Sequence, residues 1–204
     1  MQKGMDADND LGRHKEASAM ALSKPAPRKH IHTRKIKCEG YQREDGLWDI
    51  EASIIDTKTY SFDNLDRGGI ASGEPIHHMR VRVTIDDDLE IQAAEAVTLA
   101  SPFTICDQGA PAVSGLKGLK IGPGWRNAVG DVLGRTKSCT HIRDLVTGPL
   151  AQAAYQTIIP MRNRKNANEP PKRKPAVLGT CVAYDSTGPI VKRIWPQYYT
   201  GSTD

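Results

Sequence analysis

The feature that most restricts the fold of this chain is a strict apolar alternation beside an acidic turn. Between His78 and Ile85 every second residue is apolar, and the residues in between are arginine or threonine. A period of two is typical of a β-strand that buries one face. Aspartates at 86–88 form a turn, and LEIQAAEAV then returns as a partner strand from Leu89 to about Thr98. We therefore predict an antiparallel hairpin with one face against a core.

A second hairpin precedes this one along the chain. Residues 34–43 read as an extended segment, and Asp45-Gly46 is a dipeptide typical of a tight hairpin turn. In LWDIEASII, from Leu47 to Ile55, apolar and polar residues largely alternate again. Two successive hairpins predict a four-stranded antiparallel sheet.

The pattern after the second hairpin becomes helical. Residues 107–116 are a short helical candidate, and residues 121–133 are a stronger one that opens with a proline in its first turn. A third pattern covers residues 139–159, where Pro149 is expected to kink or split the helix, with Gly148 as the break. Strands followed by helices predict an α+β fold, with the helices packed on one face of the antiparallel sheet.

The two ends of the chain differ from this core in composition. Residues 1–29 are polar and charged without a period, so we expect a disordered basic arm, and residues 30–204 are expected to form a single α+β domain. Within that domain, residues 160–174 read as a basic linker and residues 175–199 as two short strands or an extended tail. The net charge of +4 comes from these end segments rather than from a patterned face, so we expect no nucleic-acid binding.

Composition also bears on the cellular setting. The chain has no apolar run long enough for a transmembrane helix, and its N-terminus lacks the apolar core of a signal peptide, so we expect no membrane association. Four widely spaced cysteines in a chain of 204 residues favour reduced thiols over disulfides. We expect a cytoplasmic protein.

Three loci with metal-binding or nucleophilic side chains could converge at one end of the sheet. His77 and His78 enter the third strand, Cys106 follows the fourth, and Cys139 and His141 begin the last helix. In an antiparallel hairpin, the entrance of one strand lies beside the exit of its partner. The last helix must bring its N-terminus to the same end for all three loci to meet.

The residue types at these loci suggest metal chemistry. Imidazole and thiolate ligands suit zinc or iron, so His77, His78, Cys139 and His141 are candidate metal ligands. Cys106 is a candidate ligand or nucleophile. The remaining candidates are carboxylates that could transfer a proton in catalysis, namely Asp107 and Glu95.

Each of these residues also has a structural interpretation. A cysteine such as Cys38 or Cys181 is most often a small buried apolar residue. A histidine at a strand entrance is usually exposed or hydrogen-bonded. Cys139 and His141 are two residues apart and would diverge on a helix, so joint ligation requires Cys139 to precede the first turn. Local spacing alone favours an ordinary helix start.

Four stretches resemble the markers of an uncharacterised bacterial family that is known only as a domain of unknown function. They are YQREDGLWDIEASIIDTK, GEPIHHMRVRVTIDDDLEIQAAEAV, LKIGPGW and SCTHIRDLVTGPLAQAAYQT. The resemblance covers about residues 31–199. It implies a setting in the catabolism of aromatic or acyl-CoA compounds and names no reaction.

The order of elements is also similar to that of iron–sulfur cluster scaffold proteins, in which a hairpin precedes two helical stretches and a last helix. The resemblance implies three ligand loci: His77 or His78 stands at the first, Cys106 near the second, and Cys139 with His141 at the third. Here Pro-Phe-Thr-Ile separates the strand from Cys106, and the last pair is Cys-Thr-His rather than adjacent. These departures favour a mononuclear metal site over cluster assembly.

Three functions are consistent with these residues. The first is a metal-dependent catabolic enzyme, a lyase or hydrolase that uses Zn or Fe on an aromatic or acyl compound. The second is a metal or iron–sulfur carrier or scaffold protein, and the third is a non-catalytic binding module. We expect a small-molecule substrate for the first, and a homo-oligomer is compatible with all three. The sequence names neither the substrate nor the oligomeric state.

Overall fold

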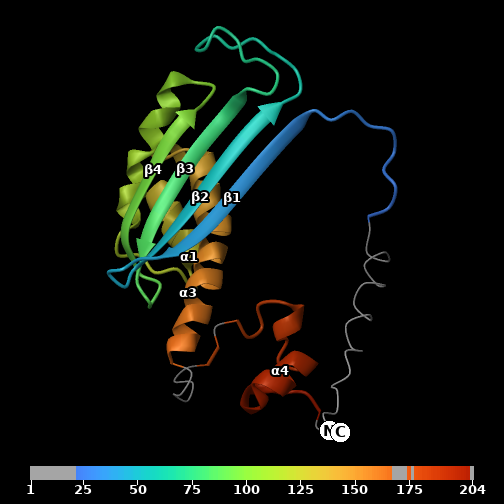
Figure 1. Ribbon diagram of the computed structural model, residues 1–204, viewed down its shortest axis with the longest axis vertical. Helices are drawn as coiled ribbons and strands as arrows, with labels where there is room; N and C mark the ends of the chain where they lie inside the picture. The colour runs from blue at the N-terminus through green and yellow to red at the C-terminus, as the bar shows by residue number, and fades with distance from the viewer. Residues whose placement is uncertain (1–21, 167–173, 176, 203–204) are drawn as a thin grey trace, which may run out of the picture.

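The structure is a computed structural model that describes residues 22–166, 174–175 and 177–202. It has one four-stranded antiparallel sheet followed by helices, which confirms the predicted α+β class (Figure 1). The strands pair in chain order, each with its neighbours in the sequence. They are β1 (His32–Gln42), β2 (Trp48–Lys58), β3 (Pro75–Ile85) and β4 (Ile91–Ala100).

Helices α1 (Trp125–Leu133) and α3 (Ala151–Lys165) lie on one face of this sheet, whereas α4 (Pro189–Ile194) lies away from the sheet (Figure 1). Two 3₁₀ segments follow the last strand, η2 (Thr104–Gly109) and η3 (Pro111–Leu116). The remaining α-helix of the described part is α2 (Thr140–Leu145). The described part also has short 3₁₀ turns: η4 (Arg135–Lys137), η6 (Val182–Tyr184) and η7 (Pro196–Tyr198).

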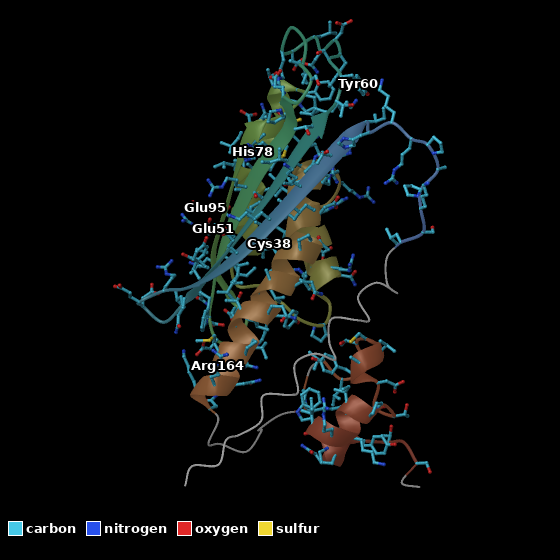
Figure 2. The ribbon with its side chains drawn as sticks, turned by 45° about the vertical axis from the view of Figure 1, so that its right-hand side comes forward. Cys38, Glu51, Tyr60, His78, Glu95 and Arg164 are labelled. Carbon is cyan, nitrogen blue, oxygen red and sulfur yellow. The ribbon has the colours of Figure 1, made fainter. Side chains whose placement is uncertain are left out.

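The alternation in the strands divides the sheet into a buried face and a charged face. The buried stripe of β2 runs from Trp48 to Ile54 and packs with the apolar residues of β3 against the helices. The opposite face carries ion pairs, among them Arg80 with Glu51 and Arg82 with Glu95. Figure 2 shows Glu51 and Glu95 on the side of the sheet away from α3.

Of the two effects expected at Pro149, a kink or a split, the structure excludes the split, because the helical path continues through this residue. A π-helical turn, η5 (Val146–Leu150), joins α2 to α3. In an α-helix, the carbonyl four residues before a proline lacks its usual donor, because proline has no N–H group. A π turn widens the helix, so this hydrogen bond is not required. Gly148 is therefore part of the helix. The helix also continues to Lys165, beyond the predicted start of the basic linker at residue 160.

In residues 175 and 177–199 the structure has neither the two short strands nor the continuous extended tail that were the alternatives predicted for this region. The chain forms the short helix α4 and flanking 3₁₀ turns there, because Pro189 suits the first turn of a helix and cannot donate to a strand ladder. The rings of Tyr184 and Trp195 lie 5.7 Å apart and pack this segment together. The predicted disordered arm falls largely on residues 1–21, outside the described residues, and residues 22–29 form no helix or strand.

The start of α2 is held at the end of the sheet where β2 ends and β3 begins. Helix α2 contacts both strands. The Ser138 hydroxyl donates a hydrogen bond of 2.7 Å to the carbonyl of Gly109, which ties η2 to the residues before the helix. A Cβ at Gly109 would stand 2.6 Å from the amide nitrogen of Cys139, so this approach requires glycine. The fold thereby brings the three predicted loci to one end.

Candidate metal centre

The site begins with a row of polar side chains across three adjacent strands. Arg34 on β1 pairs with Asp56 on β2, and Asp56 pairs with His77 on β3. Asp56 continues the alternation of the buried stripe of β2, so its carboxylate faces the helices and is only 2% exposed. A buried carboxylate at this place needs partners to offset its lost hydration.

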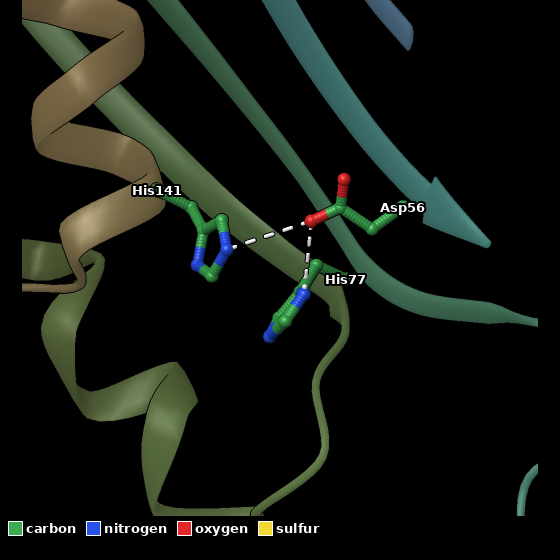
Figure 3. A group of neighbouring side chains, drawn as sticks. All are labelled: Asp56, His77 and His141. Carbon is green, nitrogen blue, oxygen red and sulfur yellow. Dashed lines mark hydrogen bonds and ion pairs between the residues drawn. The ribbon is translucent and has the colours of Figure 1, made fainter. Parts of the chain in front are cut away.

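Two histidines meet at one oxygen of that carboxylate. The Nδ1 atom of His77 lies 3.1 Å from Asp56 Oδ2, and the Nε2 atom of His141 lies 3.5 Å from the same oxygen (Figure 3). The two imidazole rings lie 3.8 Å apart between centroids, with planes 32° apart. His141 comes from α2, so the cluster joins the helix layer to the sheet.

Strand β1 supplies the remaining contacts of Asp56. The Arg34 guanidinium donates from Nε to Oδ1 at 2.8 Å and from Nη2 to Oδ2 at 2.7 Å. The Nε2 atom of His32 lies 3.2 Å from Oδ1. Both carboxylate oxygens are therefore satisfied, and the side chain has one fixed orientation.

These contacts set the ionisation of the cluster. Burial would raise the pKa of Asp56, but the hydrogen bonds and charges of Arg34 and His77 outweigh it and hold that pKa at about 2. Burial lowers the pKa of His77, and the neighbouring carboxylate of Asp56 only partly opposes this. Asp56 is thus ionised and His77 neutral at pH 7, the states that metal ligands require.

The geometry of this group fits a metal ion. Asp56, His77 and His141 each offer one ligand atom, and the three atoms lie within 4.8 Å of one another. Tetrahedral ligands at bond lengths of about 2.0–2.2 Å are about 3.3–3.6 Å apart, and cis ligands in an octahedron are about 3.0 Å apart. The distance of 3.5 Å from Asp56 Oδ2 to His141 Nε2 lies in the tetrahedral range, and the distance of 3.1 Å to His77 Nδ1 lies near the octahedral value. This buried Asp/His/His group could bind a metal.

Cys139 lies next to this group and is directed at the other nitrogen of His141. Its Sγ atom is 3.6 Å from His141 Nδ1, while Nε2 of the same ring faces Asp56. Burial would raise the pKa of the Cys139 thiol, but His141 and the backbone amides of His141 and Ile142 together lower it. As the N-cap residue of α2, Cys139 precedes the first turn, as the sequence argument required.

The structure brings some predicted site residues together and separates others. His77, Cys139 and His141 gather as described. His78 is shifted by one residue from His77 in a strand, so it lies in the phase of Arg80 rather than in that of buried Met79. Glu95 pairs with Arg82 on the charged face of the sheet, so it does not reach the cluster.

Cys106 and Asp107 lie on η2, the segment that ends against Ser138 and Cys139. Cys106 is a half-buried free thiol. Asp107 lines a shallow pocket of about 310 Å³ at the end of β4, with Arg67 and Thr104 among its neighbours. Neither belongs to the Asp56 group within the described residues.

Asp56, Arg34 and His32 are not among the site residues predicted from the sequence. A signal for Asp56 was present, because it continues the inward phase of Trp48 to Ile54 and a carboxylate there must be buried. Arg34 could have been found from the hairpin, whose turn places it directly opposite Asp56. His32 has no comparable signal, because its contact is diagonal across the ladder: its direct cross-strand partner is Lys58.

Comparison with known proteins identifies the family. Residues 32–156 match the family described as "Protein of unknown function (DUF2889)". The chain belongs to this family. The matched residues include every side chain of the Asp56 group, together with Arg34, His32 and Cys139. No curated protein and no solved structure matches the chain. The likeness to iron–sulfur scaffolds stays a prediction.

The described residues include no helix with the length and apolar character that a bilayer crossing requires.

Proposed function

We propose that this DUF2889 protein is a metal-dependent enzyme that binds Zn²⁺ or Fe²⁺ through Asp56, His77 and His141 and acts on a small organic molecule. The observation that carries the proposal is the convergence of two imidazole nitrogens on one buried carboxylate oxygen, at 3.1 and 3.5 Å. Two histidines and a carboxylate are ligands of catalytic zinc and of non-haem iron.

A set of three protein ligands supports catalysis rather than a structural role. Structural zinc sites are closed by four protein ligands, whereas catalytic sites leave a position for water or substrate. A bound ion here would polarise a carbonyl or lower the pKa of a bound water. This chemistry suits a lyase or hydrolase.

The surrounding side chains have roles in holding the ligands. Arg34 fixes the Asp56 carboxylate so that Oδ2 faces the imidazoles. The contact between Cys139 and His141 Nδ1 leaves Nε2 of that ring directed at the site. Hydrogen bonds to the outer atoms of metal ligands of this kind strengthen binding and fix ring orientation.

Metal content tests the proposal directly. Protein stripped with a chelator and dialysed against Zn²⁺, or anaerobically against Fe²⁺, should retain about one ion per chain. The variant His77→Ala should bind the ion at least about tenfold more weakly. The adjacent variant His78→Ala, on the other face of the strand, is a matched control and should bind normally. Absence of stoichiometric metal in the wild type, or equal loss in both variants, would overturn the proposal.

A second candidate function is thiol-based acyl transfer, favoured by the order of three side chains. Cys139 Sγ lies 3.6 Å from His141 Nδ1, and His141 Nε2 lies 3.5 Å from Asp56 Oδ2. This is the order of nucleophile, base and carboxylate in cysteine hydrolases. With p-nitrophenyl acetate, the metal-free protein should then release a burst of p-nitrophenolate as the acetyl group moves to sulfur. The burst should vanish in Cys139→Ala, a variant that should still bind metal.

A further inference from the structure

The Arg34 guanidinium is bound to Asp56 through only one of its two edges. Its Nε and Nη2 atoms donate to Asp56, and these two nitrogens form the side edge of the guanidinium plane. The end edge, formed by Nη1 and the second hydrogen of Nη2, has no hydrogen-bond acceptor among residues 22–166, 174–175 and 177–202. A guanidinium held in this way presents two parallel N–H groups in a fixed direction.

The Arg34 side chain lies on the accessible side of the site. The side chains of Arg34 and His32 are 40% and 44% exposed, whereas those of His77 and His141 are 21% and 17% exposed and that of Asp56 is 3% exposed. A molecule that approaches the metal ligands from solvent on the β1 side meets Arg34 and His32 first. Both residues come from the edge strand of the sheet.

The local charge on this side favours an anion. Asp56 carries one negative charge and Arg34 one positive charge. A divalent cation bound by Asp56, His77 and His141 would add two positive charges. The other acid that acts on Arg34 is Asp144 on α2; its side chain is 62% exposed, and its carboxylate lies 4.0 Å from Arg143 Nε. Asp56 and Arg34 balance each other, so a bound divalent ion would give the site a net positive charge, and among the described residues no acid contacts the end edge of Arg34.

We propose that the end edge of Arg34 binds a carboxylate group of the substrate. A planar carboxylate matches the two parallel N–H groups, and Asp56 has already fixed the orientation of the guanidinium. Because Asp56 Oδ2 contacts both Arg34 and the two histidines, an acid bound to Arg34 lies beside the metal ligands. The inference deepens the proposed function, on which it rests, by naming small organic carboxylates as the substrate class.

Calorimetric titration with benzoate and with neutral benzamide, which has a similar shape, tests this assignment. Both metal-free and zinc-loaded wild-type protein should bind benzoate at least about tenfold more tightly than benzamide, and the loaded form should bind it more tightly still. Arg34→Gln should lose this preference. Arg80→Gln removes the same charge from the opposite face of the sheet and should keep it.

The outcomes separate this inference from the metal proposal. Benzoate binding that survives Arg34→Gln, equal binding of benzamide, or no benzoate binding by either form would overturn the carboxylate assignment whatever the metal content. A wild-type protein that takes up no metal yet prefers benzoate would overturn only the metal proposal. If Arg34→Gln does not fold, Arg34→Lys keeps the charge but loses the two parallel donors, and benzoate binding that it leaves unchanged contradicts the assignment.

Discussion

Arg34 and Asp56 face each other directly across the β1–β2 ladder, and the guanidinium donates to both oxygens of the carboxylate. The pair stands where the buried stripe of β2 meets the edge strand, so one partner is nearly inaccessible and the other is half exposed. A carboxylate in that position stays ionised only because of its neighbours. The stability of the protein and the proposed metal binding therefore both depend on the Asp56 side chain.

The first prediction concerns acid stability of the metal-free protein. The pKa of Asp56 is about 2 in the folded protein, below the ordinary value near 3.8 that it regains on unfolding. Its stabilising contribution is therefore complete above pH 4 to 5 and is lost as the pH falls toward 2. The difference corresponds to about 2 kcal/mol of unfolding free energy.

Urea unfolding between pH 7 and pH 2.5 measures this contribution. The Asp56→Asn variant is the control, because an amide at this position has no proton to gain. The difference in unfolding free energy between wild type and variant should shrink as the pH falls below 4. A difference that is constant across this range would show that Asp56 is not the group responsible.

The hairpins and their facing residues were predictable from the sequence because they depend on local rules. Alternation fixed which side chains of β2 and β3 are buried, and the turn after residue 42 fixed the β1–β2 register and hence the Arg34–Asp56 pair. Alternation also separates His77 from His78, since only His77 shares the phase of Met79. The burial of Asp56, its pairing with Arg34 and the inward phase of His77 were therefore all predictable from the sequence.

The meeting of His77 with Asp56 and His141 was not predictable from local pattern. The β2–β3 register is set through a long loop over residues 59–74, whose Arg67 and Glu74 pair within the loop, rather than by a tight turn. The approach of His141 depends on how α2 packs on the sheet. Packing of this kind is decided by side chains distant in the sequence.

The second prediction concerns the reactivity of Cys139. His141 lowers the pKa of this thiol against the opposing effect of burial. In the metal-free protein, the pH at which iodoacetamide alkylation of Cys139 reaches half its maximal rate should be higher in His141→Ala than in the wild type. Peptide mass mapping separates Cys139 from the other three cysteines. A pH profile that His141→Ala leaves unchanged would contradict the contact between the two side chains.

The third prediction concerns the packing of α3 on β1. A Cβ at Gly40 would overlap with the side chain of Thr157 on α3, so Gly40→Ala should lower the unfolding free energy by about 1–3 kcal/mol. The three atoms nearest to this Cβ all belong to the Thr157 side chain. Thr157→Ala in the same chain should therefore restore most of the loss, and thermal unfolding of the two single variants and the double variant measures it. A double variant whose loss equals the sum of the single losses would show that the two sites do not touch.

The fourth prediction links backbone packing to the metal ligands. A Cβ at Gly109 would stand 2.6 Å from the amide nitrogen of Cys139 and 3.1 Å from the carbonyl carbon of Ser138, so Gly109→Ala must displace backbone rather than a flexible side chain. Because His141 follows two residues later, we expect Zn²⁺ affinity to fall by about tenfold. Gly130→Ala is the matched control: its Cβ meets nothing within 4 Å, and it should stabilise α1 by about 0.5–1 kcal/mol with normal Zn²⁺ binding. Competition with a chromogenic chelator measures both affinities. Equal Zn²⁺ affinities in the two folded variants would show that the position of α2 does not govern the site.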